Sequence, residues 1–270
     1  MPKLPKLPAP PLPAALQEPP PRPGESGGDG GPLEAAQKAG VTVVDWVDER
    51  TSLSGAARWM MFRKVPKGTN WFYTLGSATM FAFLSQAVTG VFLAMYYRPD
   101  PAGGAYESIR YVTNDVFLGQ FVRGMHKWGS SVMVILVFLH MGRTFFFGAY
   151  KYPRELNWVI GVVLLILTMT MSFTGYLLPF DQRAYWATIV GVNINGTGPL
   201  IGPYLSDFLR GGSEFGATTL SRFYAIHMLL VPGLLAALIG AHLYLVAKLG
   251  TTAPPWQKAE KRSELREAEV

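Results

Sequence analysis

The 270-residue sequence contains no cysteine, and this absence excludes several kinds of chemistry at once. Without a thiol the chain forms no disulfide, ligates no iron–sulfur cluster, performs no thiol catalysis and attaches no prosthetic group through thioether bonds. Charged residues are also scarce, at 16% of the chain, with a net charge of +6. The charges flank long apolar runs, which is typical of a membrane protein rather than of a nucleic-acid-binding protein.

Four apolar runs are long enough to cross a bilayer, which takes about 20 residues. They cover about 71–97, 116–147, 156–179 and 223–247. Three of them have no charged residue, and the second is charged only near its ends. The sequence therefore predicts an all-α fold, a membrane bundle of four helices. The long connection after the third run is rich in Gly and Pro, and residues 200–209 could form short surface helices.

The remaining segments divide the chain further. Residues 1–40 hold 11 of the 21 prolines and predict a disordered tail, either solvated or acting as a docking arm. Residues 41–70 mix apolar and charged residues at helical spacing, which predicts an amphipathic helix on the membrane surface. Residues 71–250 form the predicted four-helix domain, and residues 251–270 form a polar C-terminal tail.

The distribution of Lys and Arg predicts the orientation. Near the spans, twelve of these residues fall on the side that holds both termini, and seven fall on the opposite side. Cytoplasmic segments carry the excess of positive charge. We therefore expect a multi-pass protein with both termini in the cytoplasm.

The chain has only four histidines, and they form two pairs inside two of the apolar runs. His126 and His140 are fourteen residues apart, and His227 and His242 are fifteen apart. Each step corresponds to about 21–23 Å along a helix and returns to nearly the same face. A single histidine in an apolar helix is more often a hydrogen-bonded core residue. Four histidines in matched pairs, in a membrane where ionisable groups are costly, instead predict ligands.

The predicted topology decides which histidines meet. The runs 116–147 and 223–247 cross the membrane in the same direction. His126 therefore pairs with His227 near the outer face, and His140 pairs with His242 near the cytoplasmic face. Two imidazoles on opposite sides of a plane are what a six-coordinate haem iron needs, so the pattern predicts two stacked haems.

Two glycine pairs repeat the fourteen-residue step of the first histidine pair, Gly76 with Gly90 and Gly161 with Gly175. Glycine inside a helix costs about 1 kcal/mol relative to alanine in water, so it usually has a packing reason. Close helix–helix packing is the ordinary reason in membranes. Repetition at the ligand spacing favours another, in which flat haem macrocycles press against the helix backbones.

Arg123 and Arg143 each lie three residues outside a histidine of the second run. An arginine at this depth is often a simple membrane-interface anchor. Since both are placed alike, and arginine pairs with carboxylates through parallel hydrogen bonds, we predict that they bind haem propionates.

The motifs around these residues resemble cytochrome b of the quinol-oxidising bc complexes, and most closely the short form, cytochrome b6. The resemblance covers about residues 44–250. In mitochondrial cytochrome b both histidine steps are fourteen, whereas the fifteen-residue step here is similar to cytochrome b6. The motifs are Tyr96-Tyr-Arg-Pro99, Arg123-Gly-Met-His126-Lys-Trp128, His140-Met-Gly-Arg143, Pro153-Arg-Glu-Leu-Asn-Trp158, Thr174-Gly-Tyr-Leu-Leu-Pro179-Phe-Asp-Gln182 and Thr219-Leu-Ser-Arg-Phe-Tyr-Ala-Ile-His227.

The resemblance implies an electron-transfer subunit of a respiratory or photosynthetic quinol:cytochrome c-type oxidoreductase. Its cofactors would be two haem b, and its substrates quinol at the outer face and quinone at the cytoplasmic face. Implied partners are a subunit carrying the C-terminal half of cytochrome b, a Rieske iron–sulfur protein, a c-type cytochrome and the lipid membrane, with the complex a homodimer. No nucleic acid is implied.

The family pattern is incomplete in this chain. The Pro-Glu-Trp-Tyr motif that helps to form the quinol-oxidation site is absent, so the chain alone lacks the full site and no catalytic residue is assigned. By family position, Tyr176–Gln182 and Gly196–Leu209 wall the outer quinone site and meet the Rieske domain. Lys248 and the residues before the first span, which starts at about 71, flank the inner one.

One departure concerns a third haem. Cytochrome b6 attaches it through the cysteine of Phe-Tyr-Cys-Leu-Gly, but this chain reads Phe72-Tyr-Thr-Leu-Gly76. Thr74 cannot form a thioether, so we expect no covalent c-type haem. The same departure favours a bacterial plasma membrane over a chloroplast.

Two other functions compete with this interpretation. The same dihaem subunit could serve another quinol-linked respiratory complex, such as a nitrogen- or sulfur-oxide module, and neighbouring subunits would distinguish the two. A haem-free four-helix anchor or transporter belongs to a different class, and it predicts no b-type haem absorbance.

Overall fold

The computed structural model describes residues 40, 43, 45–52, 54–55, 62 and 68–257, and these residues contain no strand. The chain divides into two compact units, with the boundary after Val65. In the first unit residues 45–51 are helical, and Arg50 lies 4.3 Å over the Trp46 ring. Almost all of the expected tail 1–40, much of the expected surface helix and residues 258–270 lie outside the described residues, so those assignments stay predictions.

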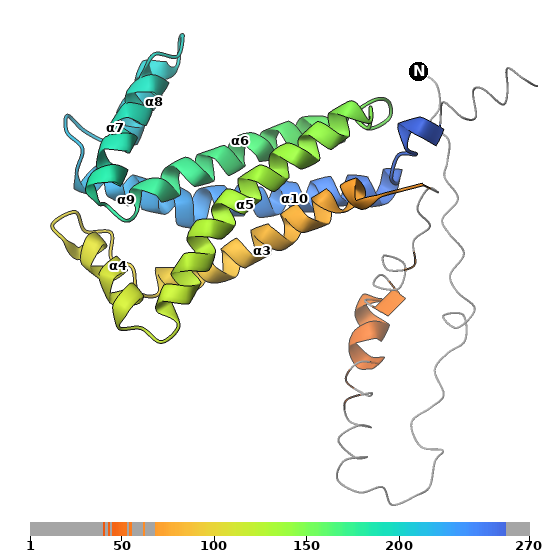
Figure 1. Ribbon diagram of the computed structural model, residues 1–270, viewed down its shortest axis with the longest axis horizontal. Coiled ribbons are helices and arrows are strands. Elements are labelled where there is room, and N and C mark those ends of the chain that lie inside the picture. Colours follow the sequence, from red (N-terminus) through yellow and green to blue (C-terminus); the bar gives the residue numbers. More distant parts are fainter. Residues whose placement is uncertain are drawn as a thin grey trace, which may run out of the picture. The chain divides into compact units, whose positions relative to one another are not determined.

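The second unit contains four helical spans that are long and apolar enough to cross a membrane, as predicted (Figure 1). Three of the spans are single helices, or nearly so, and the fourth is a continuous run of three elements. They are η2 Trp71–Thr74 with α3 Leu75–Ala94; α5 Gly119–Phe146; α6 Glu155–Leu177; and α9 Ala217–Ala225 with η3 Ile226–Leu230 and α10 Val231–Leu249.

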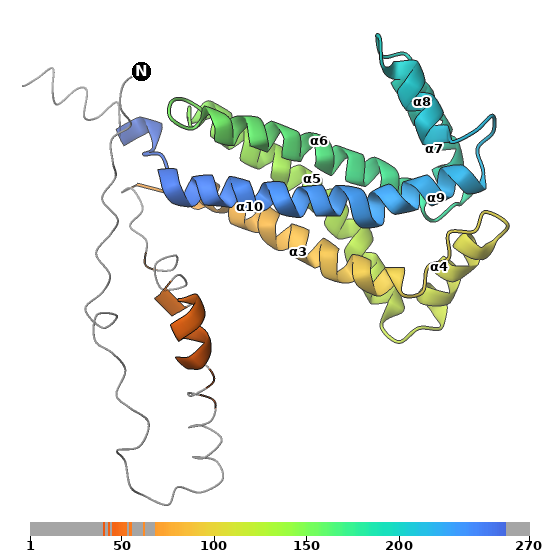
Figure 2. The same ribbon diagram turned by 180° about the vertical axis from the view of Figure 1, so that it is seen from behind.

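The spans pack side by side, α3 mainly against α5 and α6 mainly against α10 (Figures 1 and 2). Only 6% to 11% of the most apolar stretch of each span is buried within the chain. The remaining apolar surface needs cover from lipid or from bound groups, because water would make its exposure costly.

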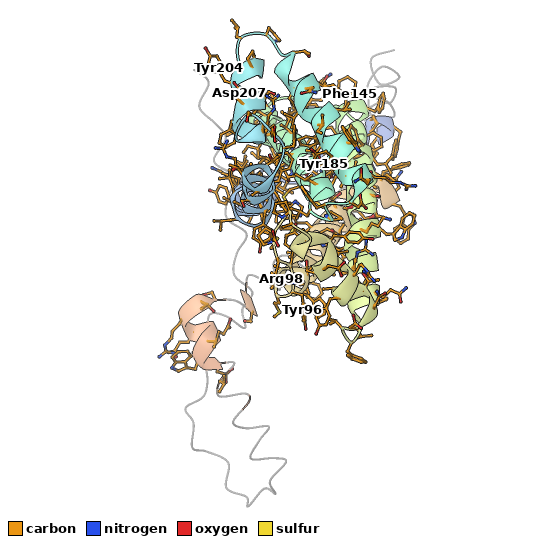
Figure 3. All side chains as sticks on the ribbon, turned by 90° about the vertical axis from the view of Figure 1, so that its left-hand side faces the viewer. Tyr96, Arg98, Phe145, Tyr185, Tyr204 and Asp207 are labelled. Atoms are coloured by element: carbon orange, nitrogen blue, oxygen red, sulfur yellow. The ribbon has the colours of Figure 1, made fainter. Side chains whose placement is uncertain are left out.

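Three shorter helices gather at one end of the bundle, α4 Gly104–Asn114, α7 Gln182–Gly196 and α8 Gly202–Arg210 (Figures 1 and 2). The buried apolar core lies at this end, and Leu177, Leu220 and Phe223 have no exposed surface. Seen end-on, Tyr185 of α7 lies nearer the centre of this face than Tyr204 of α8 (Figure 3). The end of the bundle at which α3 finishes therefore carries a cap, which is made of α4, α7 and α8.

Neither α4 nor α7 was expected from the sequence. Gly103 (φ +116°) turns the chain into α4, whose Ala105, Ser108 and Val112 are buried at helical spacing. The Asp181 side chain accepts a hydrogen bond from Ala184 N at 2.8 Å and so caps the start of α7. Short helices of this kind are stabilised by packing on the bundle, and no long apolar run marks them.

The fourth span also begins earlier than expected, at Ala217 instead of about residue 223. Thr219 Oγ1 accepts from Gly216 N at 3.2 Å and donates to Arg210 O at 2.5 Å. These bonds satisfy backbone groups at the start of α9 and at the end of α8, so the helix extends beyond its apolar part.

Candidate functional site

The four histidines lie in two facing pairs between the second and fourth spans. The ring centres of His126 and His227 are 6.3 Å apart, and those of His140 and His242 are 6.5 Å apart. An imidazole nitrogen bonds a metal at about 2.0 Å, so two imidazoles in line on one metal have ring centres about 6 Å apart. Both separations therefore fit one metal ion between two rings, and the pairs are those that the topology predicted.

A π-helical turn explains how histidines separated by unequal steps along the two helices still face each other. In η3, which contains His227, Val231 N donates to Ile226 O, five residues earlier. A π-turn holds one residue more than an α-turn and is most frequent at functional sites. Pro232 follows directly and has no N–H to offer to the α-helical pattern. The extra residue of the fifteen-residue step is thus taken up in η3, and His242 returns to the face of His227.

The pair His126 and His227, called the outer pair after its predicted position in the membrane, opens into a cavity of about 680 Å³. This volume lies in the usual range of pockets for cofactors and small molecules. The cavity touches both rings and the backbones of Gly90 and Gly175. Its charged lining residues are Arg123, Lys127, Asp181 and Arg183. Three of these four are cations, so the lining suits a ligand that is largely apolar and carries anionic groups.

Tyr97, from the Tyr-Tyr-Arg-Pro motif, helps to wall this cavity. Its hydroxyl donates to Leu178 O at 2.6 Å, and its ring stacks on Tyr224 with centroids 5.4 Å apart. Burial, and next the neighbouring Tyr224, raise the pKa of Tyr97 above its ordinary value of 10.0. The hydrogen bond from this hydroxyl holds the segment after α3 to the end of α6.

Each predicted glycine lies against one predicted histidine ligand. A Cβ built on each glycine would meet the ring Cε1 of that histidine at a distance that differs from pair to pair. The pairs and distances are Gly175 with His227 at 2.5 Å, Gly76 with His140 at 3.1 Å, Gly90 with His126 at 3.2 Å and Gly161 with His242 at 3.8 Å. The first neighbour of each glycine is thus the imidazole ring. A side chain at Gly175 would have to displace the ring, whereas one at Gly76 or Gly90 would require the ring to give by a few tenths of an ångström.

Arg143 has the environment of an anion-binding residue. Its guanidinium lies 3.7 Å over the ring of Tyr73, and its Nε and Nη2 are buried without a hydrogen-bond partner among the described residues. A buried donor without an acceptor is costly, and a carboxylate is the acceptor that suits a guanidinium best. Arg123, its counterpart at the other end of α5, lines the outer cavity beside His126.

Two threonines that the sequence did not mark as site residues touch the outer histidines. Thr89 Oγ1 lies 2.9 Å from His126 Nδ1, and Thr174 Oγ1 lies 3.3 Å from His227 Nδ1. His227 Nδ1 also lies 3.0 Å from Met171 O. Each threonine directly precedes one of the predicted glycines, and this repeated Thr-Gly pair was the signal available in the sequence.

Comparison with known proteins identifies the family of the chain. The family described as Cytochrome b/b6/petB matches residues 60–250. The chain belongs to the cytochrome b family. Members of this family bind b-type haem.

Similar proteins include complete short-form relatives. The chain is 44% identical over 218 residues to the menaquinol:cytochrome c reductase cytochrome b subunit of Geobacillus thermodenitrificans, covering 78% of this chain and 97% of that one. It is 42% identical over 213 residues to cytochrome b6 of Heliobacterium modesticaldum, covering 78% and 100%. Among solved structures, a chain of a hyperthermophilic respiratory Complex III shares 32% identity with a TM-score of 0.71. That match covers 78% of this chain and spans only 56% of the other.

The close approach of Gly175 to His227 leads to a first prediction. Gly175→Ala should displace the His227 ring and lower the haem content of the purified protein from two per chain to about one, measured by pyridine haemochrome. Gly233→Ala is the matched control, because Gly233 is in the neighbouring span and a Cβ added there would have no other atom within 4 Å. An alanine at Gly175 that leaves the haem content unchanged would contradict the proposed contact.

The π-turn leads to a second prediction. Deleting Leu229, which is 77% exposed, should convert η3 to regular α-helix and leave a fourteen-residue step between His227 and His242, so haem content should be kept. Deleting Ile135 of α5, 57% exposed, should rotate His140 by about 100° against His126, since α5 has no π-turn to absorb the change. Haem loss in both deletions, with the proteins still folded in the membrane, would show that η3 does not act as a register correction.

Proposed function

We propose that this chain is the electron-carrying cytochrome b subunit of a quinol:cytochrome c-type oxidoreductase complex. In this function it moves electrons across the membrane between a quinol-oxidation site at the outer face and a quinone-reduction site at the cytoplasmic face. The observation that carries the proposal is the pair of imidazole separations, 6.3 Å and 6.5 Å, stacked along the same two spans.

In this proposal two b-type haems bind between α3, α5, α6 and the fourth span. The outer iron is held by His126 and His227, and the inner iron by His140 and His242. The glycines nearest these rings, Gly90 and Gly175 outside and Gly76 and Gly161 inside, give the rings and macrocycles room beside the helix backbones. When bound, each haem supplies a one-electron iron couple.

The contributions of the chain itself are positioning and charge. Arg143 offers a propionate at the inner site two buried nitrogens that have no hydrogen-bond partner in the part of the chain that the structure describes. Arg123 offers the same group at the outer cavity. Neutralising a carboxylate inside a membrane protein with arginine lowers the cost of holding it there. The apolar spans exclude water from the electron path between the two histidine levels.

The relatives guide the choice of substrate and partners. Two of them are named for menaquinol:cytochrome c reductase activity, and we propose a menaquinol-type quinol for this chain as well. The chain spans 56% of the Complex III chain that it resembles. A separate subunit would then supply the C-terminal half of cytochrome b, together with a Rieske protein and a c-type cytochrome, in a dimeric complex. Thr74 leaves no thioether site for a further haem.

The haem assignment is tested on the complex purified in detergent. Pyridine haemochrome should give two b-type haems per chain, titrating as two redox components. His140→Ala and His242→Ala should each remove the inner component and leave the outer one, because the two ligand pairs share no residue. Full haem content in either variant would contradict the pairing. A folded wild-type complex without haem would refute the proposed function and favour an anchor or transporter.

The orientation is tested with the help of the cysteine-free sequence. We propose a bacterial plasma membrane with both termini in the cytoplasm, which places the α7–α8 end outside. A single cysteine at Ser213→Cys, exposed in the loop after α8, should react with a membrane-impermeant maleimide added to intact spheroplasts. A single cysteine at Lys151→Cys, exposed between α5 and α6, should react only after permeabilisation. The reverse pattern would mean that the chain is inserted the other way.

A further inference from the structure

The two histidine pairs differ in one repeated detail, the residue that precedes each glycine. At the outer pair this residue is a threonine on both helices, Thr89 before Gly90 and Thr174 before Gly175. At the inner pair the corresponding residues are Leu75 and Ile160, and neither has a hydroxyl. The difference occurs on both helices, and it distinguishes two sites that lie at different depths in the membrane.

The hydrogen-bond geometry favours one direction for the outer contacts. Thr89 Oγ1 has one hydrogen, and it lies within donating distance of Ser85 O at 2.7 Å. Its contact with His126 Nδ1 at 2.9 Å therefore has the imidazole as donor and the hydroxyl oxygen as acceptor. This arrangement puts the proton of neutral His126 on Nδ1 and leaves Nε2 free for a metal.

Thr174 on α6 has the same arrangement as Thr89 on α3. Thr174 Oγ1 donates to Thr170 O at 2.8 Å, so His227 Nδ1 donates to Thr174 Oγ1 at 3.3 Å and to Met171 O at 3.0 Å. Thr89 is 5% exposed and Thr174 is fully buried, so water does not compete for either contact. Both outer rings thus have their second nitrogen held by a buried hydroxyl.

The inner rings have fewer partners. His242 Nδ1 is buried and makes no hydrogen bond within normal limits to a described residue, although the backbone of Asn157 lies near the ring. Thr79, the hydroxyl residue one turn along from Leu75, donates to Leu75 O at 2.9 Å. The inner imidazoles therefore lack the threonine acceptor that both outer imidazoles have.

We propose that Thr89 and Thr174 lower the reduction potential of the haem held by His126 and His227. An imidazole that donates Nδ1–H to an oxygen is a more basic ligand through its other nitrogen. A more basic ligand favours the ferric over the ferrous state, which makes the iron harder to reduce. The inner haem lacks this contribution, so the threonines bias the equilibrium toward electrons residing on the inner side. The inference rests on the proposed function, because it takes the two pairs to be haem ligands.

The test is a redox titration of the purified complex with Thr89→Val and Thr174→Val combined. Valine keeps the branched shape and removes the hydroxyl, so both haems should remain bound. We expect about a tenfold shift of the outer Fe(III)/Fe(II) equilibrium toward Fe(II), equivalent to a rise of about 59 mV for one electron. The inner component should not move. The outer component is identified by repeating the titration with His140→Ala, which should remove the inner component and leave only the outer one.

Matched variants separate tuning from a merely structural effect. Thr168→Val removes a buried hydroxyl from α6 that donates to Leu164 O at 2.8 Å, and it should leave both potentials unchanged. Thr174→Ser keeps the acceptor and should retain the wild-type potential. Ile160→Thr gives the inner site the missing hydroxyl and should lower the inner potential. The reduction potential of each haem in a variant is compared with that of the same haem in the wild type, so the different charges around the two sites cancel.

The outcomes bear differently on the two proposals. An outer potential that stays constant in the double valine variant, with both haems bound, would overturn the inference and leave the haem assignment intact. An equal shift in Thr168→Val would also overturn it. Should the double variant lose the outer haem, Ile160→Thr decides, since an unchanged inner potential there would refute the inference. Absence of haem from the wild-type complex would refute the proposed function itself.

Discussion

The structure depends on one geometrical constraint, that two imidazoles on different helices face each other across about 6 Å at two depths in the membrane. Helix rise and twist fix where the second ring of each helix points once the first is placed. The consequences extend to the neighbours, because α3 and α6 can approach the rings only where a glycine leaves room. The same constraint explains η3, since in a regular α-helix a fifteen-residue step would leave His242 about 100° around the axis from the direction that a fourteen-residue step gives.

The distribution of burial explains why such a chain and its cofactors would depend on each other. The fully buried apolar side chains gather near α7 and α9, at one end of the bundle, whereas the spans bury little of their apolar surface within the chain. Lipid can cover the outward faces. The faces marked by glycines and imidazoles need a different cover, and a group that binds the folded state there stabilises it by mass action. Binding of such a group and folding of the spans around it would in this sense be coupled in one equilibrium.

The sequence predicted the four spans and the facing histidines because apolar length and helical period are local signals. It did not predict α4 or α7, whose positions are decided by packing on the bundle. The π-turn was also inaccessible, because a fifteen-residue step alone does not say whether the helix turns or takes up a residue. Thr89 and Thr174 were missed for a related reason, since their histidine partners are 37 and 53 residues away. Contacts across that separation are set by helix pairing, which periodicity does not describe.

The π-turn has a meaning for the history of the fourth span. In this chain the extra residue of the fifteen-residue step is taken up in one turn between His227 and Pro232, and regular α-helix follows from Val231. A lineage could therefore change the length of this span by one residue without an intermediate that has lost a ligand. The second span has no such turn, and its fourteen-residue step is correspondingly fixed. Spans with different histidine steps could thus share one scaffold, with the gap in their alignment placed within Ile226–Leu230.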